Sequence, residues 1–209
     1  MAIYDKKYFE KYAMLSLVYC FDSELAPMLM GKSESPDWQS DELDLGIEVC
    51  RALSKKQGEE NSIVNRYFGQ GLLGEEIQKE VARRFPKYKD SIHVHEHVAY
   101  TSKDYTTFDE KYREIEACII RKTRLLNSGI YKVFSSNWLY IFADTALLQS
   151  WDIELIQNRV REKNVKMKVK YDVIVINAID KLWIVKKDSE YMKKELNDEM
   201  LAFLKKEAQ

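Results

Sequence analysis

Residues 33–52 read S-E-S-P-D-W-Q-S-D-E-L-D-L-G-I-E-V-C-R-A. Two short apolar runs flank a polar connector, a pattern that predicts a β-hairpin. If the turn is centred near Glu42, Asp37 in the first arm lies opposite Ile47 in the second arm and diagonal to Glu48. If they share a face, the two carboxylates would be roughly 5 to 8 Å apart. That separation suits one divalent cation.

The second arm of the hairpin is the more informative one. In an extended strand Gly46, Glu48 and Cys50 face one side and three aliphatic residues face the other. Gly46 would leave room for a ligand or for a close backbone approach. The alternation also describes any half-solvated strand, and Asp37 after a proline would suit a simple turn. The pattern alone leaves both explanations open.

The composition is that of a globular protein. The chain has 209 residues and a mass of 24.7 kDa, which is ordinary for one domain with its own core. Hydrophobic residues make up 45% and charged residues 32%, with only 7 Gly and 3 Pro, which excludes a low-complexity chain. No apolar run has the length of a signal or of a membrane span, so neither export nor a membrane is expected.

The charge is balanced overall and uneven locally. The net charge is −1 and the sequence pI about 6.4, so the global basic charge of many nucleic-acid-binding proteins is missing. Between residues 159 and 170, however, basic residues stand against a single acid, Glu162. Such a strip could follow a phosphate backbone. It could equally be solvated surface.

Three cysteines, Cys20, Cys50 and Cys118, are scattered without the spacing of a metal or redox motif. Each has apolar neighbours, which is typical of a buried free thiol. The pattern therefore predicts reduced cysteines and a cytoplasmic location.

All histidines of the chain fall in one short segment, as His93, His95 and His97. On a strand their imidazoles would share a face, which is one way to hold zinc or another transition metal. The alternative is an exposed strand whose alternation places histidines outside. The alternative is favoured because no fourth ligand is evident nearby.

Periodicity predicts most of the secondary structure. Apolar residues at helical spacing predict helices, and short apolar runs predict strands. The predicted helices are 5–21, 75–85, 107–127, one that contains 148–156, and 191–206. The predicted strands beyond the first hairpin are 138–143, 171–178 and 182–185, the last two as a hairpin at the sheet edge. This order predicts an α/β fold with a mixed sheet.

The strongest helix prediction covers 107–127, where Thr107 would cap the start and Asn127 with Gly129 would end it. Counting at helical spacing puts Lys122 inside the apolar stripe of this helix. Burial of an ammonium group without a partner is costly. Either the lysine stem follows apolar surface until the head reaches water, or the head meets an acid on the hairpin.

Four segments together suggest a family. S-P-D-W followed by G-I-E-V-C-R-A, a helix with I-I-R-K-T-R-L-L-N and a strand W-L-Y-I-F-A-D resemble the PD-(D/E)XK nuclease-like superfamily, and more narrowly its small bacterial members with a PD pair followed by G-x-E-V-T. The resemblance covers most of the chain in order. It implies an α/β, restriction-endonuclease-like fold with a mixed central sheet flanked by helices. It also implies one nuclease-like domain over 1–209, with a variable insertion at about 53–105.

The resemblance implies metal-dependent hydrolysis of phosphodiester bonds in DNA or RNA. Asp37 matches the signature aspartate and Glu48 the acid of the (D/E)XK element, and the Val49 carbonyl would be a further metal ligand. Ligation by oxygen alone suits Mg²⁺ or Mn²⁺. Glu10 resembles the acid that many members carry on the first helix, with Glu24 as a rival.

The chain departs from the family at one position. The family has a lysine two residues after the acid, where this chain has Cys50. A thiol cannot position water as a cation or neutralise a phosphate. In some members of the fold the lysine comes from the neighbouring helix, and Lys122 is the matching candidate here.

Two hypotheses follow. The first is an active nuclease that binds nucleic acid, with DNA favoured, in which Asp37 and Glu48 hold the metal ion and Lys122 assists. The second is a catalytically inactive nuclease-like module that binds nucleic acid or a protein partner. Enzymes that cut both strands are commonly dimers, which leaves a homodimer open, although no coiled-coil heptad or interface patch marks one in the sequence.

Overall fold

The computed structural model describes residues 5–21, 25, 34–53, 55–67, 72–95, 98–101, 108–143, 148–188 and 190–209. The chain divides into two compact units. The larger consists of Lys7–Ala52 and Thr107–Gln209, and the smaller of Met1–Lys6 and Leu53–Thr106.

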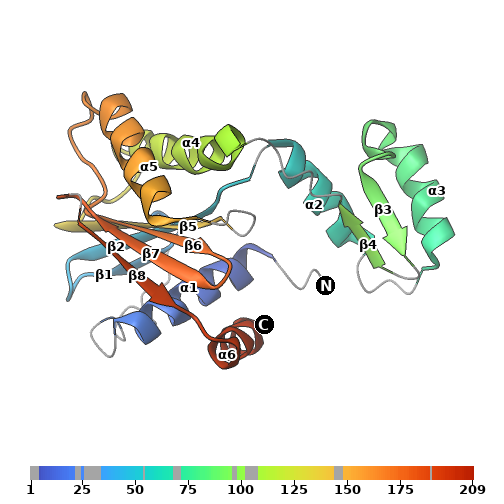
Figure 1. Ribbon diagram of the computed structural model, residues 1–209, viewed down its shortest axis with the longest axis horizontal. Coiled ribbons are helices and arrows are strands. Elements are labelled where there is room, and N and C mark those ends of the chain that lie inside the picture. The colour runs from blue at the N-terminus through green and yellow to red at the C-terminus, as the bar shows by residue number, and fades with distance from the viewer. Residues whose placement is uncertain are drawn as a thin grey trace. The chain divides into compact units, whose positions relative to one another are not determined.

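The larger unit is built on a six-stranded mixed sheet (Figure 1). Its strands are β1 (Trp38–Ser40), β2 (Leu45–Arg51), β5 (Ser136–Phe142), β6 (Val173–Ala178), β7 (Lys181–Lys186) and β8 (Tyr191–Glu195). They lie in the order β1-β2-β5-β6-β7-β8. The central strands β2, β5 and β6 run parallel, whereas β1, β7 and β8 pair antiparallel with their neighbours. The predicted α/β fold with a mixed sheet is confirmed.

Helices cover both faces of this sheet (Figure 1). One face carries α1 (Lys6–Cys20) and α6 (Asp198–Ala208), and the other carries α4 (Phe108–Leu126) and α5 (Ser150–Lys163). The alternation of side chains along β2 separates the two cores. Leu45, Ile47 and Val49 pack on the α1 side, whereas Cys50 packs on the α4 side, as predicted. No helix in the described part of the chain is both long and apolar enough to cross a membrane.

Strand β5 lies in the middle of the sheet and is buried on both faces. Tyr140 and Phe142 belong to the α1 core, and Leu139 and Ile141 to the α4 core. A strand covered on both faces needs a continuous apolar sequence rather than an alternating one. This explains why the apolar run at 138–143 correctly predicted a central strand.

The register of the first hairpin differs from the prediction by one residue. Ile47 pairs with Trp38 rather than with Asp37. The connector includes Asp44 at a φ of 43°, a left-handed conformation that Asp tolerates. A shift of one residue exchanges the faces of every side chain. Extending the observed register by one residue would bring Asp37 opposite Glu48, just beyond the last pair of the β1–β2 ladder.

The C-terminal prediction is wrong in its first part. The start of the predicted helix 191–206 forms β8, so the β6–β7 hairpin does not lie at the sheet edge. Helix α6 begins only after Asn197, whose Oδ1 accepts the Met200 N–H at 2.8 Å. This N-cap competes with extension of the helix backwards. Met192 on β8 and Phe203 on α6 are 41% and 49% exposed, so neither faces the core.

The smaller unit has its own core. Its elements are α2 (Lys55–Tyr67), α3 (Gly74–Arg84), the short 3-10 helix η2 (Pro86–Tyr88), β3 (Ile92–His95) and β4 (Val98–Thr101). The core consists of Ile63, Tyr67, Ile77, Val81, Tyr88 and Ile92. The helix predicted over 75–85 is confirmed as α3. Helix α2 was missed because Gly58 interrupts its pattern, yet this glycine lies inside the helix, with open space where a Cβ would be.

Candidate active site

The hairpin that carries the two acids is anchored at its turn. The Asp44 N–H donates to the Asp41 carbonyl at 3.3 Å, which closes the turn. The Asp44 carboxylate accepts hydrogen bonds from the Ser135 hydroxyl and from the Ser135 N–H, the latter at 3.2 Å. These two bonds lower the pKa of Asp44. Because Ser135 immediately precedes β5, the turn is held against the neighbouring strand.

Asp37 lies immediately before β1 and is 2% exposed. Its Oδ2 accepts the Val49 N–H at 2.8 Å. In an extended strand the N–H and C=O of one residue point to the same side. The Val49 carbonyl is therefore directed toward the same edge of β2 as the Asp37 carboxylate, beyond the last pair of the β1–β2 ladder.

Glu48 is the most unusual side chain of the larger unit. The residue is 3% exposed. Its Oε1 accepts hydrogen bonds from Lys122 Nζ and, at 3.0 Å, from the Tyr131 hydroxyl. Its Oε2 is buried without a hydrogen-bond partner. Leaving a buried carboxylate oxygen unpaired is destabilising by about 1 to 3 kcal/mol or more, so this atom is a candidate ligand for a group that the protein itself does not supply.

Lys122 reaches Glu48 because α4 runs antiparallel to β2 across the sheet face. Cys50 on β2 is paired with Cys118 on α4. Glu48 comes two residues before Cys50 on the strand, and its partner Lys122 comes four residues after Cys118 on the helix. Two residues of strand and four of helix both advance about 6 to 7 Å, so the pairs stay in step. The Lys122 side chain is only 15% exposed, and its head meets an acid. This is the second of the two sequence explanations for a lysine in the apolar stripe.

The prediction of free thiols is wrong for two of the three cysteines. Cys50 and Cys118 form a disulfide, and Cys20 is the free thiol. Cys50 and Cys118 come from elements far apart in sequence, so spacing alone could not pair them. Burial raises the pKa of Cys20 to about 11, although the charge on Lys194 lowers it. The inference of a reducing cytoplasm rested on free thiols and loses that support.

Two tyrosines complete the surroundings of Glu48 and were not singled out from the sequence. Tyr131 donates to Glu48, and the Tyr171 hydroxyl donates to the Lys122 carbonyl at a long 3.4 Å. Burial raises the pKa of Tyr171, and the charges on Glu48, Tyr131 and Asp37 raise it further. Neither tyrosine lies in a motif. In the sequence, Tyr171 was only the first residue of a predicted strand.

The expectation of ligand room at Gly46 is wrong. A Cβ on Gly46 would lie 2.6 Å from Phe134 Cδ2 and 2.8 Å from Pro36 Cγ. The glycine therefore allows two rings to pack against β2. The remaining space, bordered by Glu48 and Tyr131, is too small to admit a water molecule.

The predicted metal-ligating atoms are all oxygens, which is the donor type that Mg²⁺ and Mn²⁺ prefer. The unpaired Glu48 Oε2, the Asp37 carboxylate and the Val49 carbonyl are all oxygen donors near one edge of β2. Mg²⁺ is commonly held by only one or two carboxylates and keeps several waters, whereas the space beside Glu48 admits no water in this arrangement of the side chains. Within the described ranges, no group of three or more His, Cys, Asp or Glu side chains could hold a metal ion.

The remaining predicted residues are less closely associated with Glu48. Glu10 is buried on α1, which covers the opposite face, and its carbonyl accepts the Trp38 indole N–H at 3.2 Å. This contact places the Glu10 backbone beside the strand that follows Asp37. Its rival Glu24 lies outside the described residues. Two histidines, His93 and His95, lie on β3 of the smaller unit, and the third falls outside the described ranges.

The resemblance to the PD-(D/E)XK superfamily rests on the motif residues and stays a prediction. The structure shows a six-stranded mixed sheet with helices on both faces. No known protein family, curated protein or solved structure matches this chain.

Proposed function

We propose that this chain is a divalent-cation-dependent nuclease of the PD-(D/E)XK kind, with a restriction-endonuclease-like fold, that hydrolyses phosphodiester bonds of DNA or RNA. The observation that carries the proposal is the unpaired Oε2 of buried Glu48. A buried carboxylate that serves only the fold is expected to have both oxygens satisfied. Glu48 has one oxygen satisfied and the other unpaired, and a second buried acid, Asp37, is bonded to the N–H of the next residue, Val49.

The proposed roles follow from the donor atoms. Glu48 Oε2, the Asp37 carboxylate and the Val49 carbonyl would hold Mg²⁺ or Mn²⁺. When bound, such an ion polarises a phosphate and lowers the pKa of a coordinated water. Tyr131 orients the Glu48 carboxylate through its hydrogen bond to Oε1, as outer-shell partners of metal ligands commonly do.

Lys122 would take the role of the lysine that the family motif has at the position of Cys50. Its ammonium lies against Glu48, on the same face as the proposed ligands. From there it compensates the charge of the acid. With substrate bound, it would neutralise a phosphate oxygen and position the attacking water, which are the tasks of a cation at this position.

The test is a cleavage assay on labelled single-stranded DNA, double-stranded DNA and RNA, with Mg²⁺ or Mn²⁺. We expect the wild type to cut at least one substrate, and Asp37→Asn and Glu48→Gln each to lower the rate about 100-fold or more. The matched control is Glu116→Gln, a second buried glutamate on α4. Cleavage that survives both Asp37→Asn and Glu48→Gln would exclude the proposed site.

One observation favours a second candidate function. The space around Glu48 admits no water, and Cys50 is held in a disulfide where the family has its lysine. Both features suit a catalytically inactive nuclease-like module that binds nucleic acid or a protein partner. Absence of cleavage on all three substrates, together with binding of one of them in a fluorescence anisotropy titration, would favour this module. Sedimentation of the same samples would report whether the chain is a homodimer.

A further inference from the structure

A cavity of about 250 Å³ lies in the larger unit, and Glu48 is not among the residues that line it. It lies where α4 and α5, which cover one face of the sheet (Figure 1), pack over β6 and β7. The apolar part of its wall is formed by Ile119, Ile153, Ile156, Val160, Tyr171, Ile174, Ile176 and Val185, and the other seven lining residues are polar or charged. An apolar cavity of roughly 150 Å³ accommodates one benzene ring. This one therefore has room for a bicyclic ring system or for one ring with a substituent.

One polar atom in the cavity wall lacks a partner. Asn164 lines the cavity, is 3% exposed, and has its Oδ1 buried without a hydrogen bond. The backbone of Asn164 is used fully, because its N–H bonds the Val160 carbonyl and its C=O accepts the Met167 N–H. Buried amide oxygens are normally hydrogen-bonded. A ligand with an N–H or O–H group would satisfy this oxygen.

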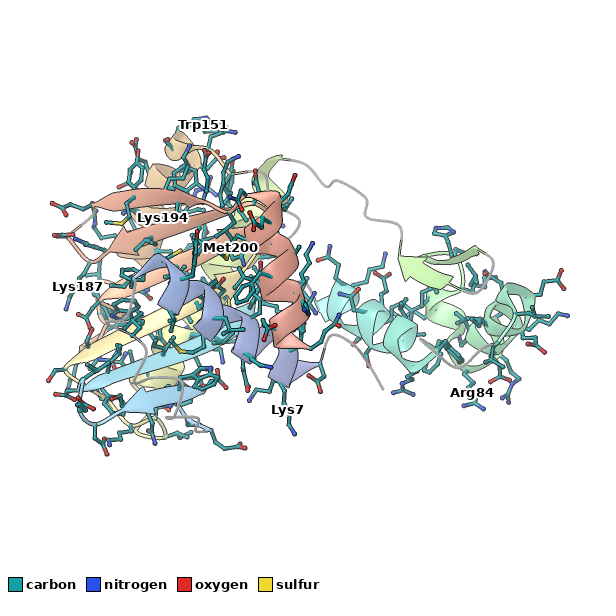
Figure 2. The ribbon with its side chains drawn as sticks, turned by 90° about the horizontal axis from the view of Figure 1, so that it is seen from below. Lys7, Arg84, Trp151, Lys187, Lys194 and Met200 are labelled. Carbon is teal, nitrogen blue, oxygen red and sulfur yellow. A yellow bond between two sulfur atoms is a disulfide. The ribbon has the colours of Figure 1, made fainter. Side chains whose placement is uncertain are left out.

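The edge of the cavity is basic. Arg161, Lys170, Lys186 and Lys187 line it, and Lys187 projects into solvent (Figure 2). Lys186 and Lys187 already face acids, at 3.6 Å from Glu190 and 3.2 Å from Asp172. Lys170 forms no ion pair with any described residue, so its charge is available to a ligand.

The location of Lys170 also clarifies the basic strip at 159–170. Arg159 and Lys163 are bound to Glu116, at 3.2 Å and 2.9 Å. These two cations therefore serve the contact between α4 and α5. Arg161 and Lys170 instead lie at the cavity. The strip is thus divided between a structural ion pair and the edge of a possible binding pocket, rather than forming one continuous track.

We infer that this cavity binds a small aromatic anion that carries a hydrogen-bond donor. The ring would fill the apolar interior, the donor would meet Asn164 Oδ1, and the carboxylate or phosphate would lie against Lys170. Concave, mostly apolar pockets with a few well-placed polar groups are the usual form of small-ligand sites. The inference is independent of the proposed nuclease activity, because it uses none of the residues assigned to the metal site.

The test is calorimetric titration of the full chain with three matched probes. Indole-3-acetate has the ring, the donor and the charge; naphthalene-1-acetate lacks the donor; indole-3-acetamide lacks the charge. We expect indole-3-acetate to bind about 10-fold more tightly than either analogue, which is one hydrogen bond or one exposed charge contact. Absence of binding by all three at millimolar concentration would overturn the inference.

Three variants assign the contacts. Asn164→Leu should remove the preference for indole-3-acetate over naphthalene-1-acetate, and Lys170→Gln should remove its preference over the uncharged amide. The control is Lys166→Gln, an exposed lysine of the same basic strip outside the cavity, which should bind like the wild type. Lys170 is only partly buried, so its variant should fold even if Asn164→Leu does not. Equal binding by wild type and Lys170→Gln would overturn the charged contact and with it the proposed ligand class.

Discussion

Two buried glutamates form ion pairs that involve helix α4, and their hydrogen bonding differs. Glu116 on α4 is paired with two cations of α5, whereas Glu48 on β2 is paired with one lysine of α4. Glu116 has both oxygens engaged, Oε1 by Arg159 at 3.2 Å and Oε2 by Lys163 at 2.9 Å. Glu48 has Oε1 engaged by Lys122 and Tyr131, whereas Oε2 is unpaired. The two side chains are equally buried, at 5% and 4% exposure. Burial alone therefore does not distinguish a structural acid from a candidate functional one.

The cations differ as well. Arg159 and Lys163 are 36% and 55% exposed, so water screens their charges and either can be lost at small cost. Lys122 is 15% exposed and is the cation bound to Glu48. An ion pair removed from water is costly to break from one side. The charge of Glu48 is thus compensated by one lysine, whereas Glu116 keeps one cation if the other is removed.

Replacement of Lys122 should have the largest effect on stability. Lys122→Met leaves Glu48 buried without its cation, and we expect a loss of about 3 to 5 kcal/mol in the free energy of unfolding. Urea unfolding followed by circular dichroism measures it. The double variant Lys122→Met with Glu48→Gln should recover most of the loss, because the uncompensated charge is gone. A loss below about 1 kcal/mol would mean that the pair is solvated.

The disulfide should have the next largest effect. It joins residues 68 apart and fixes β2 to α4 one helical turn from Lys122. Changing Cys50 and Cys118 to serine should lower the free energy of unfolding by roughly 2 to 4 kcal/mol. Thermal unfolding with and without reductant measures the same difference in the wild type.

Thiol counting provides the control for the disulfide. The oxidised, denatured wild type should present one free thiol, from Cys20, and the reduced protein three. Three free thiols before reduction would contradict the cross-link.

High pH should report on the surroundings of Glu48. Because the pKa of Tyr171 is raised above its ordinary value of 10.0, folding favours the neutral phenol. This contribution is complete below pH 10 and is lost as the pH rises toward the folded pKa, by about 1.4 kcal/mol per pH unit. Tyr171→Phe should make the stability less sensitive to pH between 10 and 11.

The same titration compares the two glutamates. Glu48→Gln should lower the pKa of Tyr171, because the charge on Glu48 raises it. Glu116→Gln should leave it unchanged, a result readable from tyrosine carbon shifts by NMR. An equal effect of both variants would remove the special status of Glu48.

The smallest effect is expected at the Glu116 site. Lys163→Met should cost less than about 1 kcal/mol, since this lysine is half exposed and Arg159 remains in place. Chemical denaturation beside Lys122→Met gives the direct comparison. A cost equal to that of Lys122→Met would show that the two sites are built alike.

Sequence patterns predicted those parts of the fold that depend on local periodicity. The alternation along β2, the apolar stripe of α4 and the continuous run of β5 each reflect which faces are buried, so their patterns identified them. The hairpin register was missed by one residue because it depends on Asp44 in a left-handed conformation. The predicted terminal helix started too early, at residue 191, because the apolar residues of the edge strand β8 happen to be spaced as they would be in a helix.

The candidate site was predictable only in part. The motif brought Asp37 and Glu48 to attention, and a lysine in an apolar stripe pointed to Lys122. The Cys50–Cys118 disulfide and the tyrosine contacts to Glu48 and Lys122 join elements distant in sequence, so no local pattern contains them. The unpaired Oε2 is likewise a property of the packed structure.

Binding of Mn²⁺ tests the central claim most directly. Calorimetric titration of the wild type, Glu48→Gln and Glu116→Gln compares the carboxylate that has an unpaired oxygen with the one whose two oxygens are both paired. We predict a site in the wild type and in Glu116→Gln, with affinity lowered about 10-fold or more in Glu48→Gln, as expected when a metal ligand or its support is removed. Equal affinity in Glu48→Gln and the wild type would contradict the assignment of Glu48 as a metal ligand.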